Sequence, residues 1–186
     1  KQGKESVQLS QLLQMGGHLS MGQEASLTSE YMTALHYGLT PDGEINWQEI
    51  EEVAMKSKPR VIWSGGTAYT RIFDWKKYAE IADKVGAYFV ADIAHIAGLI
   101  IAGVHKSPVD FAHIITTTTH KTLRGPRGAL VFAKKQLMES IDASIFPGLQ
   151  GGPHLHSIAG IAIALEKTKT KEFKKYAFRV VANAQR

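Results

Sequence analysis

Residues 88–92 read Tyr88-Phe89-Val90-Ala91-Asp92, and this short stretch decides the expected fold. Its first four residues form a continuous apolar run, without the alternation of polar and apolar side chains that a half-exposed strand shows. Such a run is typical of a strand buried on both faces, as in a parallel sheet that is covered by helices. The stretch therefore predicts a central strand of an α/β domain.

Segments on either side of this strand alternate between strand-like and helix-like patterns. Asp74 can cap a helix whose apolar residues recur at helical spacing until Gly86 ends it. The sequence further predicts strands at 33–38, 60–63, 112–116 and 129–132, a helix that starts with a capping box at Asn46 and Glu49 and ends by Pro59, and two helices between His156 and Ala182. This alternation of strand and helix indicates the α/β class.

The composition fits an ordinary globular chain and excludes several classes of protein. The 186 residues are 44% hydrophobic, and 22 Lys and Arg against 17 Asp and Glu give a net charge of +5. The chain has no cysteine, so disulfides and cysteine-ligated metal sites are excluded. No apolar run approaches the roughly 18 residues of a membrane helix, and acids are interspersed among the basic residues. We therefore expect a soluble protein in a reduced compartment, with no membrane or nucleic-acid partner.

Polar residues follow the expected strands, at the edge of the sheet where ligands bind in α/β folds. Asp92 directly follows a buried run, and a carboxylate there needs a cation or several donors nearby. Lys121 follows four threonines and is flanked by His120, Arg124 and Arg127, and neighbouring positive charge favours the neutral, nucleophilic form of an amine. Taken singly, Asp92 could equally pair with an arginine and Lys121 could be a surface charge. Together they are the amine and carboxylate that pyridoxal phosphate chemistry requires.

Residues 116–128 have the sequence TTTTHKTLRGPRG, which resembles the cofactor-lysine segment of the serine hydroxymethyltransferase family. Three further segments agree with this family in order and spacing, namely residues 16–19, 92–99 and 146–153. The resemblance covers essentially the whole chain. It implies a three-layer α/β/α fold with a mostly parallel, mixed sheet, the aspartate-aminotransferase-like large domain of fold-type I pyridoxal phosphate enzymes.

The resemblance also implies a domain assignment and a reaction. Residues 1–186 would be the central part of the cofactor-binding large domain, without the N-terminal segment and the C-terminal small domain, and the start at Lys1 without a methionine fits a processed or partial chain. The implied reaction is the reversible conversion of serine and tetrahydrofolate to glycine and 5,10-methylenetetrahydrofolate, a step of one-carbon metabolism and glycine biosynthesis. A cytoplasmic homodimer or dimer of dimers with shared active sites is implied. Because several of the family's site residues have no counterpart here, we expect this chain alone to be inactive.

The resemblance assigns roles to individual residues. Lys121 would form the internal aldimine with pyridoxal 5′-phosphate, Asp92 would pair with the pyridine nitrogen, and His18 would stack on the ring. The implied catalytic set is Lys121, His18, Asp92, His95 and Thr118; the other implied cofactor contacts are Thr67, His95, His120, Gly151 and Gly152; the implied folate contacts are Gly17, His18 and Leu19. His154 and His156 have no acidic or cysteine third ligand nearby, so we expect no metal site.

Two other functions remain open from the sequence. One is a folate-independent aldolase that acts on β-hydroxy amino acids with the same cofactor, suggested by Met21 where the family has a second histidine. The other is a non-catalytic fragment that only oligomerises or binds anionic partners, suggested by the missing site residues.

Overall fold

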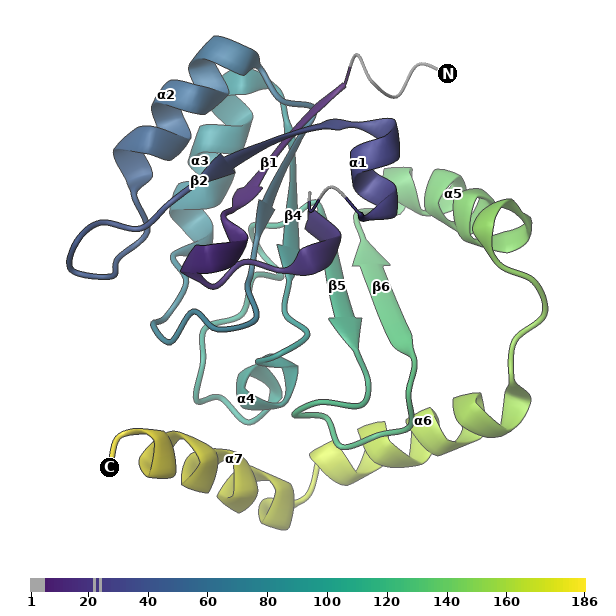
Figure 1. Cartoon of the computed structure of the whole chain (residues 1–186). Helices are drawn as coiled ribbons and strands as arrows, with labels where there is room; N and C mark the ends of the chain where they lie inside the picture. Colours follow the sequence, from purple (N-terminus) through teal and green to yellow (C-terminus); the bar gives the residue numbers. More distant parts are fainter. Residues whose placement is uncertain (1–5, 22, 24) are drawn as a thin grey trace. The chain divides into compact units, whose positions relative to one another are not determined.

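The computed structural model describes residues 6–21, 23 and 25–186, and it divides into two compact units (Figure 1). The first unit comprises Lys1–Asp92 and Pro108–Ile114, and the second comprises Ile93–Ser107 and Ile115–Arg186. The start of the chain at Lys1, noted above, lies outside the described residues. No helix in the described part of the chain is long and apolar enough to span a membrane.

Four parallel strands form the sheet of the first unit. In order across the sheet they are β2 (Thr33–Tyr37), β1 (Val7–Gln11), β3 (Val61–Ser64) and β4 (Tyr88–Asp92). Ile62 lies opposite Phe89 in the register between β3 and β4, and both side chains are fully buried. Val90 and Ala91 are buried as well, whereas Tyr88 at the start of the strand is 41% exposed, so the parallel strand is confirmed and its burial holds for residues 89–91.

Helices α2 (Trp47–Ser57) and α3 (Trp75–Val85) pack against this sheet and against each other. Both begin where predicted, because the side chains of Asn46 and Asp74 accept hydrogen bonds from the backbone N–H three residues later. The capping box at Asn46 is only half formed: the Glu49 carboxylate accepts from the backbone N–H of Gly38 at 2.7 Å. Glu49 thereby ties the start of α2 to the end of β2.

A buried aromatic cluster joins these helices to the sheet. The hydroxyl of Tyr37 donates to the carbonyl oxygen of Trp63 at 3.1 Å, so the hydroxyl of Tyr78, 2.8 Å away, donates to Tyr37. The ring of Tyr78 stacks on Phe89 with centroids 5.6 Å apart. Burial raises the pKa of both tyrosines above the usual range, because a phenolate would lose its hydration.

Strand β1 is absent from the strands predicted above, although it lies inside the sheet. Its residues Gln8 and Gln11 are polar and almost fully buried. The Gln8 side chain accepts a hydrogen bond from the Trp63 indole at 3.1 Å, and the Gln11 amide donates to the carbonyl of Met15 at 2.5 Å. The alternation of apolar and polar residues from Val7 to Ser10 fits a strand with one exposed face, whereas both faces are largely buried here and the partners of the glutamines come from other parts of the chain or from the following turn.

The second unit contains a strand pair and most of the remaining helices. Strands β5 (Ile114–Thr118) and β6 (Ala129–Ala133) are neighbours and run in opposite directions in Figure 1. The helices are α4 (Ala97–Ile101), α5 (Lys135–Ala143), α6 (Leu155–Thr168) and α7 (Lys171–Ala184), with a π-helical segment at Ser144–Leu149. Helix α7 packs against both α4 and α6. Strand β5 is shifted by two residues from the prediction, and the two C-terminal helices are confirmed.

Short helical segments complete the described chain. They are two 3-10 turns at Leu13–Met15 and Leu19–Met21 and helix α1 (Leu27–Tyr31) in the first unit. The mostly parallel strands and flanking helices confirm the α/β class.

Candidate active site

The segments that follow β1 and β3 meet in the first unit. The carbonyl oxygen of Gly16 accepts hydrogen bonds from the backbone N–H groups of Thr67, at 2.8 Å, and Ala68, at 3.2 Å. A Cβ on Gly66 would lie 2.3 Å from that same oxygen, so the two backbones touch where only glycine fits. The structure therefore brings the segment before His18 directly against the segment that contains Thr67.

Asp92, the last residue of strand β4, lies against Gly65, which directly precedes the Gly66 that contacts Gly16. Gly65 has a positive φ of 103°, and a Cβ built on it would lie 1.9 Å from the carbonyl oxygen of Asp92. The end of β3 is thus pressed against the backbone of Asp92, whose side chain is half-buried. This contact fixes the point from which the carboxylate leaves the sheet.

His18 is held in one ring orientation by Ser20. The backbone N–H of Ser20 donates to Nδ1 of His18 at 3.1 Å, and the Ser20 hydroxyl lies 2.6 Å from the same nitrogen. Since a backbone N–H can only donate, Nδ1 is an acceptor and the proton of the neutral ring lies on Nε2. His18 also lines a cavity of about 220 Å³ together with His36 and polar residues at the end of β1.

The folate residues implied by the resemblance flank this histidine. Gly17 is buried, and a Cβ on it would lie 2.2 Å from the carbonyl oxygen of Gln11. Leu19 is 58% exposed, which is high for a leucine and leaves its side chain available to a ligand. Met21 is buried, and its carbonyl accepts from the Ser10 hydroxyl at 2.6 Å.

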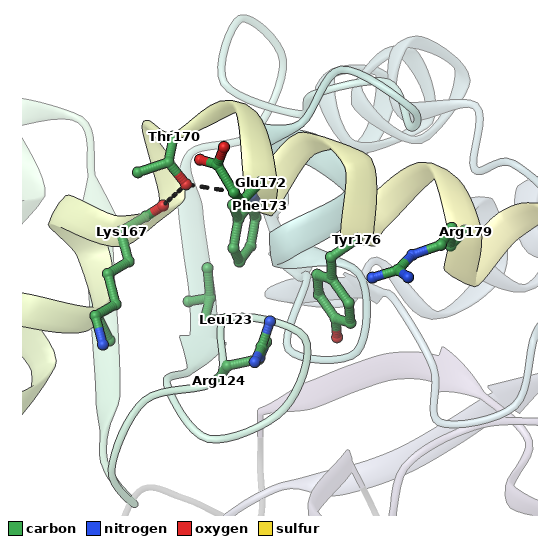
Figure 2. A pocket seen from close by; sticks show the side chains of 9 residues that line it. Leu123, Arg124, Lys167, Thr170, Glu172, Phe173, Tyr176 and Arg179 are labelled. Carbon is green, nitrogen blue, oxygen red and sulfur yellow. Dashed lines mark hydrogen bonds between the residues drawn. The ribbon is translucent and has the colours of Figure 1, made fainter.

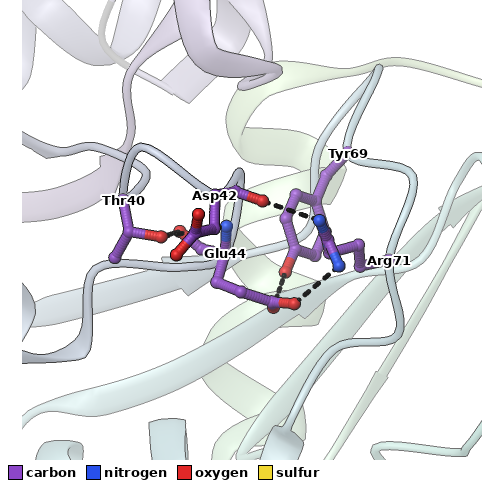
Figure 3. Close-up of polar contacts among 5 residues, drawn as sticks. All are labelled: Thr40, Asp42, Glu44, Tyr69 and Arg71. Carbon is purple, nitrogen blue, oxygen red and sulfur yellow. Dashed lines mark hydrogen bonds and ion pairs between the residues drawn. The ribbon is translucent and has the colours of Figure 1, made fainter.

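The segment after Thr67 is fastened to the turn that follows β2 by a polar cluster, shown in Figure 3. Arg71 forms a salt bridge with Glu44 at 2.8 Å and donates to the carbonyl oxygen of Asp42 at 2.6 Å. The hydroxyl of Tyr69 donates to Glu44 at 3.3 Å. Burial, and next the Glu44 carboxylate, raise the pKa of Tyr69. The cluster is partly exposed, so we expect it to position the loop more than to stabilise the fold.

In the second unit, Lys121 lies in a loop that connects β5 to β6 and closes on itself. The backbone N–H of Thr119 donates to the carbonyl of Gly128 at 3.0 Å, and the N–H of Gly125 donates back to Thr119 at 2.7 Å. The Thr119 hydroxyl donates to the carbonyl of Pro126 at 2.7 Å. These bonds give the lysine a rigid support.

His95 is brought to this loop through Thr122. The Thr122 hydroxyl donates to the carbonyl oxygen of His95 at 3.2 Å and accepts from the backbone N–H of Gly98 at 3.0 Å. A Cβ on Gly98 would lie 2.5 Å from the Thr122 carbonyl, so the start of α4 touches the loop through backbone. Thr122 therefore links the segment that contains His95 to the loop that contains Lys121.

Two predicted site residues carry buried polar atoms without a hydrogen-bond partner among the described residues: Oγ1 of Thr118 and Nδ1 of His120. Arg127 donates to Nε2 of His120 at 3.2 Å, so the proton of the neutral ring lies on Nδ1. Buried polar groups in proteins are nearly always paired. Gln8, Gln11, Ser64 and Thr116 also carry such atoms, so the two near Lys121 in the sequence are compatible with a ligand that supplies the missing partners but do not by themselves define its place.

Gly151 and Gly152 are not brought to the other site residues within the described part of the chain. Both are exposed, and a Cβ on either would have no atom within 4 Å. The rings of His154 and His156 lie 5.5 Å apart, and the described residues contain no group of three or more potential metal-ligating side chains.

A second cavity, of about 320 Å³, adjoins the loop after Lys121, where Leu123 and Arg124 line it, and is shown in Figure 2. It is lined by residues of the loop, of α6 and of α7. The guanidinium carbon of Arg124 lies 4.8 Å from the centre of the Tyr176 ring, in contact with its face. Leu123 and Phe173, which also line this cavity, are 3% and 5% exposed.

Sequence reasoning missed Ser20, Thr122 and Gly65 as supports of the site. A hydroxyl two residues after a histidine is a usable sequence signal for Ser20. Thr122 and Gly65 act through His95 and Asp92, each 27 residues away in the sequence, and no local pattern marks them.

Comparison with known proteins gives a family assignment. A family model described as serine hydroxymethyltransferase matches residues 3–186. Curated proteins named serine hydroxymethyltransferase are similar: that of Coprothermobacter proteolyticus is 50% identical over 178 residues, covering 95% of this chain and 43% of the relative. That of Acidothermus cellulolyticus is 52% identical over 173 residues, covering 92% and 40%, and that of Desulfotalea psychrophila is 47% identical over 176 residues, covering 95% and 41%. The chain thus spans about two-fifths of the length of these relatives.

Proposed function

The chain belongs to the serine hydroxymethyltransferase family, and on that premise we propose that it supplies the cofactor-lysine part of an enzyme that interconverts serine and glycine. The one-carbon group would pass to or from tetrahydrofolate, and pyridoxal 5′-phosphate would be the cofactor. We further propose that the chain is the central part of the large domain and that it acts in a cytoplasmic homodimer or dimer of dimers.

The residues of the second unit fit such a cofactor. The observation that carries the proposal is the pair of unpartnered buried polar atoms, Oγ1 of Thr118 at the end of β5 and Nδ1 of His120 in the loop that presents Lys121. A phosphorylated pyridine with a phenolic oxygen offers acceptors to both. Leaving such groups unpaired costs about 1–3 kcal/mol each, so a ligand that satisfies them stabilises the loop.

The residues of the first unit fit the ring of the cofactor in kind. The Asp92 carboxylate is the group that would keep a proton on the pyridine nitrogen, and its backbone is fixed by the contact with Gly65. The His18 ring, oriented by Ser20, is free to present a face because both contacts to Ser20 use the ring edge at Nδ1. The Thr67 hydroxyl is exposed and its backbone is bonded to Gly16, so it can donate without displacing the loop.

Each chain residue has a defined task in the proposed reaction. When bound, the cofactor supplies an electron sink for the negative charge that develops at the amino-acid α-carbon. Lys121 would hold the cofactor covalently through its amine. Asp92 would keep a proton on the pyridine nitrogen, which makes the ring electron-withdrawing. Thr118 and His95 would hold or move protons at the substrate, as the resemblance implies. Gly17 and Leu19 would contact the folate.

The proposal is tested by cofactor uptake, because it does not require the chain alone to turn over substrate. Pyridoxal 5′-phosphate is added to the 186-residue chain, the visible absorption band is recorded, and the adduct is reduced with borohydride and located by mass spectrometry. We expect one adduct, on Lys121, and its loss in Lys121→Met. Uptake that is absent from the wild type, or an adduct spread over the surface lysines, contradicts the proposal.

The folate-independent aldolase and the non-catalytic fragment gain no support from the comparisons. Exchange of the glycine α-proton decides between folate use and folate independence. We expect tetrahydrofolate to accelerate the exchange in the protein that contains this chain, whereas an aldolase of the alternative type would be indifferent to folate.

A further inference from the structure

We propose that Arg124 and Tyr176 are positioning residues that fix the loop bearing Lys121 against helix α7. The inference rests on the proposed function for the task of Lys121, and the contact itself stands on the geometry alone. Arg124 contacts Lys121 through a backbone hydrogen bond, so the two residues would act through the backbone of the loop.

The backbone of Arg124 is strained and is hydrogen-bonded to Lys121. Its φ of 61° is in the left-handed region, which is unfavourable for a residue with a Cβ and is kept only where surrounding contacts hold it. The backbone N–H of Arg124 donates to the carbonyl oxygen of Lys121 at 2.9 Å. The left-handed residue therefore closes the very turn that Lys121 opens, and a change at Arg124 is passed directly to Lys121.

The ring of Tyr176 is the contact that holds the side chain of Arg124. Its guanidinium lies over the face of the Tyr176 ring at 4.8 Å (Figure 2). Lys167 and Arg179 line the same cavity, which holds a single acidic residue, Glu172. Arg124 has no salt bridge within the described residues, so the aromatic face is the contact that orients its side chain.

The loop that bears Lys121 is held by contacts on both sides of the lysine. On one side Thr122 is bonded to His95 and Gly98, which fixes the loop to the start of α4. On the other side the loop is fixed to α7, through buried Leu123 and the contact between Arg124 and Tyr176. Without the α7 anchor, the turn from Lys121 to Arg124 loses the contact that offsets its left-handed end. Helix α7 thus holds the Arg124 end of the turn that begins at Lys121, while Gly125 and Gly128 of the loop pack against α6.

The test uses two matched pairs of variants of the 186-residue chain. Tyr176→Leu removes the aromatic face, and Tyr176→Phe retains it. Arg124→Gly removes the side chain while making the positive φ favourable, so any loss belongs to the side chain, and Arg124→Lys retains a cation. Two measurements are made on each: hydrogen exchange of the Arg124 and Gly125 amides, and the rate of borohydride-fixable adduct formation at Lys121 with pyridoxal 5′-phosphate.

We expect Tyr176→Leu to exchange these amides about twofold to fivefold faster and to form the adduct slower by a similar factor, as the loss of one partly exposed cation–π contact implies. Arg124→Gly should show a smaller change in the same direction, because glycine removes the cost of the positive φ. Tyr176→Phe should match the wild type, and Arg124→Lys should recover part of the loss. Amides of β1 and β3 should not change in any variant.

The outcomes separate this inference from the proposed function. If the wild type forms no adduct at Lys121, the proposed function fails, and the hydrogen exchange still decides whether α7 anchors the loop. If the wild type forms the adduct and Tyr176→Leu behaves like Tyr176→Phe in both measurements, the inference is overturned and the proposed function stands. Faster exchange with an unchanged rate of adduct formation also overturns the positioning role.

Discussion

Replacing Gly65 by alanine tests the contact that places Asp92. The new Cβ would lie 1.9 Å from the Asp92 carbonyl oxygen, and contacts under 3.0 Å are essentially never seen, so the two backbones must separate by at least about 1.1 Å. The left-handed φ of 103° adds about 1 kcal/mol for a residue with a Cβ. Forced overpacking typically costs about 1–3 kcal/mol. We expect Gly65→Ala to lower the free energy of unfolding by about 2–4 kcal/mol in total.

Gly86→Ala is the matched control for this prediction. Gly86 also has a positive φ, of 72°, but a Cβ there meets nothing within 4 Å. It should therefore lose only the backbone cost of about 1 kcal/mol. Urea denaturation followed by circular dichroism measures both variants, with the slope checked for an unchanged two-state transition.

The result that refutes the reasoning is specific. If the free energies of unfolding of Gly65→Ala and Gly86→Ala fall by the same amount within about 0.5 kcal/mol, the close approach of β3 to Asp92 does not exist in the folded protein. If the contact is real, Gly65→Ala should also bind pyridoxal 5′-phosphate more weakly than Gly86→Ala, because the carboxylate moves with its backbone.

Three further predictions concern the core, a helix cap and pH. Phe89→Ala should cost about 3–5 kcal/mol, since the side chain is fully buried and stacked on Tyr78; a loss below 1 kcal/mol in urea denaturation would contradict this packing. Asn46→Ala should cost about 1 kcal/mol and Asn46→Asp much less, because only the latter keeps an acceptor for the N–H of Glu49. Burial raises the pKa of Tyr37, so the unfolded chain ionises first: this contribution to stability is complete below about pH 10 and is lost as pH rises further. Tyr37→Phe should therefore show a shallower loss of stability above that pH, and an equally steep loss would count against it.

Much of the sheet and of the helices could be predicted from local signals. The apolar run ending at Ala91 predicts a buried strand because its burial requires no knowledge of its neighbours. The caps at Asn46 and Asp74 predict helix starts because the bond they make spans three residues. Strand β1 is missing from the prediction: its alternating apolar and polar residues indicate at most a half-exposed strand, whereas its glutamines are buried, and each makes one side-chain hydrogen bond, with Trp63 or with the carbonyl of Met15.

The candidate site divides in the same manner. Lys121 and Asp92 can be recognised from the sequence because their residue types and their places after strands carry the chemistry. The unpartnered atoms of Thr118 and His120 became visible only with burial and hydrogen bonds in hand. The placement of Gly151 and Gly152 beside a cofactor stays a prediction, because the described chain brings nothing to them.

The sequence by itself determined the α/β class and the family, and it supplied the candidate residues of the site. These follow from short-range patterns: apolar runs, caps within one turn, and a continuous motif around Lys121. Only the tertiary structure decided that β1 lies within the sheet, that Gly65 is pressed against Asp92, and that Arg124 is held in a left-handed conformation over Tyr176. Each of these depends on contacts between segments distant along the chain, where packing and backbone approach override local preference and leave no periodic trace in the sequence.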